Sequence, residues 1–146
     1  MNNLHDSVER WLVQDGHSII ETKTEDNFKI IIKNADAFSN DLEIFEPKQQ
    51  ANVLVIGVKI PLKSKQMIRY NQFNQNEKEN FEKKMTDFCY SIQVVNKFFD
   101  EDGMKKVVVY IVLDKKEQLN QPSFMTTLTK IIEVSEKTAQ FLYKSF

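Results

Sequence analysis

The sequence predicts an α+β domain in which an antiparallel β-meander is combined with N-terminal, middle and C-terminal helices. Apolar residues recur at helical spacing at both ends and in the middle of the chain, and the segments between them alternate with the two-residue period of strands. The first strands follow one another through short turns, which favours antiparallel pairing. A length of 146 residues, of which 41% are apolar, is typical of one folding unit, so we expect residues 1–146 to form a single α+β domain.

Four segments have the apolar spacing of amphipathic helices. The first has apolar residues at positions 4, 8, 11 and 12, and Gly16 can adopt the left-handed conformation that ends a helix. Asn74 and Glu77 have the spacing of a capping box at the start of the third helix. The predicted helices cover residues 3–14, 64–73, 77–91 and 122–143.

Six segments have the pattern of strands, and they cover residues 17–24, 27–34, 41–46, 51–60, 94–100 and 105–114. The first two are expected to pair as a hairpin across Glu25 and Asp26. Pro61 is expected to end the fourth strand, because proline cannot donate to a sheet ladder. Residues 94–100 can instead continue the preceding helix. We favour a strand there because residues 100–103 then form a turn into the last strand.

The last strand is apolar on both faces, although an antiparallel sheet with one solvated face should alternate. Val108, Tyr110 and Val112 lie on one face, and positions 107, 109, 111 and 113 lie on the other. Two explanations stay open: helices of this chain cover both faces, or helices cover one face and a second copy or a bound polypeptide covers the other. The candidate dimer or client face consists of Val53, Val55, Val108, Tyr110 and Val112.

The net charge of −1 conceals an uneven distribution of charge. Residues 47–76 contain five basic residues and no acidic residue. This stretch is a solvated connector, a polar partner-binding surface or a nucleic-acid contact, and the last is disfavoured because phosphate-dominated binding usually recruits more charges. The candidate partner- or anion-binding residues are Lys59, Lys63, Lys65, Arg69 and Tyr70.

Residue types that support catalysis or cofactor binding do not occur in a recognisable pattern. The three glycines lie far apart, which excludes a glycine-rich phosphate loop, and the single cysteine excludes a multi-cysteine zinc site. Cys89 lies on the apolar face of its helix, where core packing is the expected role. His5 and His17 are twelve residues apart, and neither has a second ligand nearby in the sequence. We therefore expect no catalytic residues, no cofactor and no metal site.

Signals for export or membrane insertion are not visible in the sequence. The longest apolar run, residues 107–113, has seven residues, whereas a membrane span needs about 20. We expect a soluble cytoplasmic protein without membrane contact.

The order of predicted elements resembles the type III secretion chaperone-like fold. More narrowly, the chain resembles a family of small uncharacterised prokaryotic proteins, mainly archaeal, that is assigned to that fold. The resemblance rests on residues 8–12 followed by Asp15 and Gly16, on residues 42–48, and on residues 122–128. It implies a dimerisation-prone α/β sandwich that binds polypeptide segments, and it brings no catalytic residues.

Two functions follow as hypotheses. The leading one is a non-enzymatic, chaperone-like protein-interaction module that acts as a homodimer and binds a polypeptide segment. The alternative is a small-molecule or anion-binding regulator that uses the acid-free stretch from Lys48 to Arg69.

Overall fold

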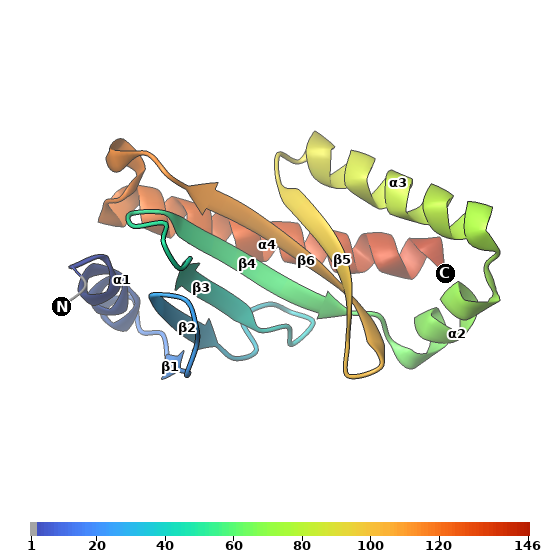
Figure 1. Cartoon of the computed structure of the whole chain (residues 1–146), viewed down its shortest axis with the longest axis horizontal. Helices are drawn as coiled ribbons and strands as arrows, with labels where there is room; N and C mark the ends of the chain where they lie inside the picture. Colours follow the sequence, from blue (N-terminus) through green and yellow to red (C-terminus); the bar gives the residue numbers. More distant parts are fainter. Residues whose placement is uncertain (1–2) are drawn as a thin grey trace.

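One antiparallel sheet and four α-helices make up residues 3–146, the part of the chain that this computed structural model describes. The sheet has the strand order β1-β2-β3-β4-β6-β5 (Figure 1). The strands are β1 (Ile20–Glu21), β2 (Phe28–Ile32), β3 (Leu42–Glu46), β4 (Leu54–Pro61), β5 (Val95–Glu101) and β6 (Met104–Leu113). The helices are α1 (Asn3–Gln14), α2 (Ser64–Gln72), α3 (Gln75–Ser91) and α4 (Gln121–Ser145), with a 3₁₀ helix η1 (Lys116–Gln118) before the last. This architecture confirms the predicted α+β class.

Side-chain caps explain where α3 and α4 begin. The Asn74 side chain accepts a hydrogen bond from the Glu77 amide at 2.8 Å, and the Glu77 carboxylate accepts one from the Asn74 amide at 3.0 Å. The predicted capping box is therefore present, and α3 begins at Gln75, two residues earlier than expected. Asn120 caps α4 in a similar way by accepting from the Ser123 amide at 3.0 Å.

The first predicted strand is mostly wrong. Of residues 17–24, only Ile20 and Glu21 pair with β2. The chain leaves the sheet after Glu21 because Thr24 turns it locally: the Thr24 hydroxyl accepts a hydrogen bond from the Asp26 amide at 3.1 Å. The expected two-residue hairpin turn is therefore a longer loop, which rejoins the sheet where the Asn27 amide donates to the Glu46 carbonyl.

The bounds of β4 also differ from the prediction. Residues 51–53 belong to a turn, in which the Val53 amide donates to the Gln50 carbonyl at 3.2 Å, so the strand begins at Leu54. Pro61 is the last residue of the strand, opposite Lys106, and the Leu62 amide still donates to the Lys105 carbonyl. The strand β4 therefore ends at Pro61, one residue later than expected.

Residues 95–101 form the strand β5, so the favoured interpretation of residues 94–100 as a strand is confirmed, with both bounds one residue later than expected. The helix α3 ends because Gln93 adopts a left-handed backbone, with φ of 62°, and the Val94 amide then donates back to the Cys89 carbonyl at 3.0 Å. This turn directs the chain into β5, which pairs along its length with β6.

The core lies between the sheet and the helices, on one face of the sheet only. Residues 54, 56, 58 and 60 of β4 and residues 107, 109 and 113 of β6 are buried under α4, which runs behind the sheet in Figure 1. The ring of Trp11 on α1 lies 5.4 Å from that of Phe124 on α4, and Phe81 on α3 lies 5.9 Å from Phe98 on β5. Burial of each such side chain contributes about 1.5–3 kcal/mol. The explanation in which helices of this chain cover both faces is therefore wrong.

Gly57 allows β4 and β6 to lie close together at the centre of the sheet. Gly57 lies opposite Tyr110, and a β carbon on Gly57 would lie 3.1 Å from the Tyr110 β carbon and 3.2 Å from the Val109 carbonyl oxygen. Both of these atoms are fixed to the backbone of β6, so they can move only if β6 itself moves.

We predict that Gly57→Ala destabilises the protein, although alanine in a strand is usually better than glycine by about 0.5–1 kcal/mol. The added methyl group must separate two paired strands, so the free energy of unfolding falls by about 1 kcal/mol or more. Denaturation with guanidinium measures this loss. Adding Tyr110→Ala should not restore stability, because alanine keeps the β carbon. An unchanged or raised stability of Gly57→Ala would contradict this account of the packing.

Cys89 is fully buried on α3, in agreement with its expected packing role. Burial raises the pKa of its thiol to about 11, from an ordinary value of 9.0.

We predict that the folded protein reacts very slowly with a disulfide reagent at pH 8, and rapidly once it is unfolded in guanidinium. Because the folded pKa is raised, the contribution of this thiol to stability is complete below about pH 9 and is lost as the pH rises towards 11. Rapid labelling of the native protein would contradict the burial of Cys89.

Candidate functional site

The sheet face opposite the helices is left uncovered by residues 3–146, and we call it the open face. Val55 on β4 and Val108, Tyr110 and Val112 on β6 lie on this face, because they alternate with the buried residues of the same strands. Val112 is 37% exposed. Four of the five residues predicted for a dimer or client face therefore share one surface, whereas Val53 lies in the turn before β4.

Neighbouring strands extend the apolar part of the open face. Phe45 on β3 lies opposite Val55, and Val95 on β5 lies opposite Tyr110. Val95 is 49% exposed. Val95 and Phe99 were missed as site residues, although the alternation of Val95, Lys97 and Phe99 in the sequence would have placed them on one face.

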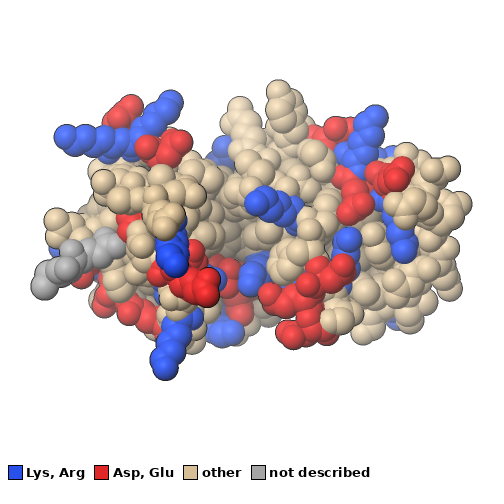
Figure 2. Space-filling model, viewed as in Figure 1, with Lys and Arg blue, Asp and Glu red and all other residues tan. Residues whose placement is uncertain are grey.

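Charged residues from five strands form a continuous series of ion pairs on the remainder of the open face. The distances between charged atoms are 4.0 Å for Lys29 and Glu43, 3.5 Å for Lys59 and Glu43, 3.7 Å for Lys59 and Glu101, and 2.7 Å for Lys106 and Glu101. We call these five residues the charge ladder. The hydrogen bond from Lys106 and the nearby charge of Lys59 lower the pKa of Glu101. Figure 2 shows the open face, with uncharged surface in its upper middle and acidic and basic side chains together below it.

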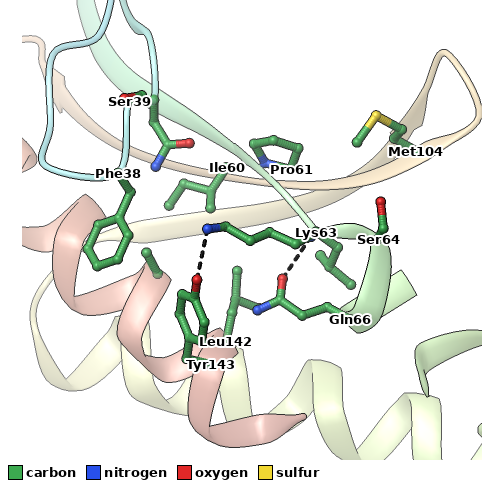
Figure 3. A pocket seen from close by; sticks show the side chains of 13 residues that line it. Phe38, Ser39, Ile60, Pro61, Lys63, Ser64, Gln66, Met104, Leu142 and Tyr143 are labelled. Carbon is green, nitrogen blue, oxygen red and sulfur yellow. Dashed lines mark hydrogen bonds between the residues drawn. The ribbon is translucent and has the colours of Figure 1, made fainter. Parts of the chain in front are cut away.

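A second candidate site lies where β4 leads into α2, beside the C-terminal part of α4 (Figure 3). The Lys63 ammonium group donates to the Tyr143 hydroxyl at 2.8 Å, and the Gln66 side-chain oxygen accepts from the Lys63 amide at 2.8 Å. These groups line a cavity of about 360 Å³ whose walls include Ile60 and Leu142. A wider hollow of about 830 Å³ adjoins it and shares Lys63 and Tyr143. We call the two together the α2 hollow.

The predicted anion-binding residues divide between three places. Lys63, Lys65 and Arg69 line the α2 hollow, and none of them forms an ion pair with another residue in the range 3–146. Lys59 lies on the open face in the charge ladder. Tyr70 is only 7% exposed and its ring packs 5.9 Å from that of Phe81, so the structure places it in the core and not with the other predicted residues.

Both histidines contact carboxylates. His17 lies 2.8 Å from Asp15. His5 lies 2.7 Å from Glu21, which is sixteen residues away, and 3.6 Å from Glu9, one helical turn away. A hydrogen bond to Glu21 raises the pKa of Glu9, and the hydrogen bond from His5 lowers that of Glu21. The expectation that His5 has no second potential ligand nearby in the sequence is wrong, because Glu9 lies four residues away on the same helix.

Membrane insertion through a helix finds no support in the fold. Within residues 3–146, none of the helices has the length and apolar character that a membrane span requires.

Comparison with known proteins shows the family and the fold. A sequence profile described as "Uncharacterized conserved protein (DUF2299)" matches residues 4–142. The chain is also similar to the crystal structure of an uncharacterized protein from Methanothermobacter thermautotrophicus, with a TM-score of 0.78 and 10% sequence identity. The similarity covers 98% of this chain and 99% of the other. None of the curated proteins compared with the chain matches it.

These results agree with the predicted resemblance to an uncharacterised family with archaeal members. At 10% identity, the structural similarity shows a shared fold only. The likeness to type III secretion chaperones stays a prediction from the order of elements. The match over residues 4–142 places the chain in the DUF2299 family of uncharacterized conserved proteins.

Proposed function

We propose that this protein is a non-enzymatic interaction module that associates with a second copy of itself through the open face. The observation that supports this proposal is the placement of α1, α3 and α4 on one side of the sheet, which leaves an apolar opposite face uncovered within residues 3–146.

The composition of the open face differs from that of a solvated sheet. The exposed side of an antiparallel sheet normally carries polar residues, which alternate with the buried ones. Here Val55, Tyr110 and Val112 occupy adjacent strands, and Val108 continues the apolar surface along β6. Removing apolar surface from water contributes about 25 cal/mol per Å², so a partner that covers this face gains free energy.

The size of the open face suits a modest dimer interface. Strands β2 to β6 lie about 4.8 Å apart and rise about 3.3 Å per residue, which gives a face on the order of 600 Å² in projection. A standard interface buries about 800 Å² of accessible surface on each partner. Projecting side chains make the accessible surface larger than the projection, so the two values are comparable.

The charge ladder is suited to a symmetric partner. Its three lysines and two glutamates alternate in sign along the series of ion pairs, and its net charge is +1. Across the sheet, Lys59 and Lys106 lie on the adjacent strands β4 and β6. In a twofold arrangement the same patch meets itself, so a lysine of one copy can face a glutamate of the other. A strongly acidic or basic polypeptide would find no such complementarity, and for this reason the proposal names a second copy as the occupant.

We predict that the protein sediments as a dimer and that Val112→Lys shifts it to a monomer. A buried lysine without a partner is costly, and the dimer dissociation constant should rise by about 100-fold, or about 2.7 kcal/mol. Sedimentation equilibrium over a range of concentrations measures this change. The matched control is Ile68→Lys, which alters a residue that is 59% exposed on α2, away from the open face.

If the wild-type protein stays monomeric at high concentration, the proposal of self-association is overturned. A Val112→Lys variant that dimerises as well as the wild type would show that any dimer uses another surface. A monomer that instead binds an unstructured polypeptide, and loses this binding on Val112→Lys, would replace the second copy by a client.

The α2 hollow supports a second function, the binding of a small anion. Lys63, Lys65 and Arg69 line one hollow that has no Asp or Glu side chain in its lining. Every lysine of the charge ladder, by contrast, is held by a glutamate. Cations without carboxylate partners in a concave site favour a phosphate or carboxylate ligand.

We predict that inorganic pyrophosphate raises the melting temperature of the wild type and that the combined change Lys63→Glu and Arg69→Glu abolishes this rise. The effect should weaken as sodium chloride is added, because exposed charges are screened. Lys48→Glu is the matched control, since it removes a cation from the same acid-free stretch outside the hollow. An equal rise in all three proteins, or none in the wild type, would remove this candidate function.

A further inference from the structure

We propose that His5, Glu9 and Glu21 form a binding site for a divalent transition-metal cation, with Zn²⁺ as the probe. This site is separate from the open face and from the α2 hollow, and it rests on neither proposed function. Its three side chains each offer one ligand atom, and these atoms lie within 4.8 Å of one another.

Two different elements bring the three ligands together. His5 and Glu9 are one turn apart on α1, so they lie on the same side of the helix. Glu21 belongs to β1, the edge strand of the sheet, and its carboxylate oxygen lies 2.7 Å from the His5 Nε2 atom. A cation between them would therefore join the N-terminal helix to the edge of the sheet.

The His5 ring is oriented by a contact outside the ligand set. It stacks on the ring of Phe28, with centroids 4.5 Å apart and planes 5° from parallel. Phe28 is buried, so its position is set by the core. Ligands that are oriented before binding lose little freedom when the ion arrives.

The charges of the site favour a cation. In residues 3–146, neither Glu9 nor Glu21 forms an ion pair with a lysine or arginine, and both lie near the same histidine. Two adjacent carboxylates repel each other, and a divalent cation between them removes this repulsion. The side chains of Glu9 and Glu21 are 44% and 47% exposed, which leaves a path for the ion.

The ligand types indicate which cations fit. One imidazole nitrogen and two carboxylate oxygens suit Zn²⁺ and neighbouring first-row ions, whereas Ca²⁺ and Mg²⁺ prefer oxygen ligands alone. Three protein ligands leave at least one position for water, as in open zinc sites.

The test is calorimetric titration of Zn²⁺ into chelator-treated protein without a polyhistidine tag. We expect one site in the wild type, and a dissociation constant raised by at least about 100-fold in His5→Gln and in Glu21→Gln. His17→Gln is the matched control, because within residues 3–146 His17 forms an ion pair with one carboxylate, that of Asp15, and belongs to no group of three potential ligands. Its affinity should equal that of the wild type.

Titration with Co²⁺ gives an independent readout. The wild type should develop visible absorption bands from a cobalt ion with a nitrogen ligand, and His5→Gln should not. Circular dichroism establishes that each variant is folded. Absence of Zn²⁺ and Co²⁺ binding by the wild type would overturn the proposal, as would wild-type affinity in a folded His5→Gln variant.

Discussion

The pairing of β4 with β6 under α4 is the interaction on which the rest of the structure depends. These strands are joined over eight residue pairs, from Leu54 and Leu113 to Pro61 and Lys106. Their buried sides form the floor on which α4 packs, and α1 and α3 then join α4 on that side through aromatic contacts. Because no helix in residues 3–146 reaches the opposite side, the same pairing that builds the core also creates the open face.

Separate parts of the molecule are suited to different kinds of contact. The open face combines apolar side chains with ion pairs that are already satisfied within the chain, which suits a broad protein surface. The α2 hollow has cations without such partners, which suits a small anion. The contact between α1 and β1 brings together carboxylates and an imidazole, which suits a metal ion. Local chemistry, rather than the fold itself, distinguishes these three proposed functions.

The sequence predicted those features that depend on local periodicity. Alternation placed Val55, Val108, Tyr110 and Val112 on one face, and the four-residue block from Asn74 to Glu77 predicted a cap that the structure contains. Features that depend on tertiary geometry could not be predicted in this way. The charge ladder requires the register of five strands, and the burial of Tyr70 depends on how α2 packs against α3. The contact between His5 and Glu21 requires the short β1 strand, whose length the apolar pattern overestimated.

The distance between two copies of the chain, measured by pulsed electron spin resonance, tests the role of the open face most directly. A spin label on Val95→Cys lies at the rim of this face, and the native Cys89 is buried and stays unlabelled. A second label, on Val13→Cys, marks the exposed side of α1. The account predicts a short, well-defined intermolecular distance from position 95 and a longer one from position 13. The absence of intermolecular coupling at high concentration, or a shorter distance from position 13, would contradict it.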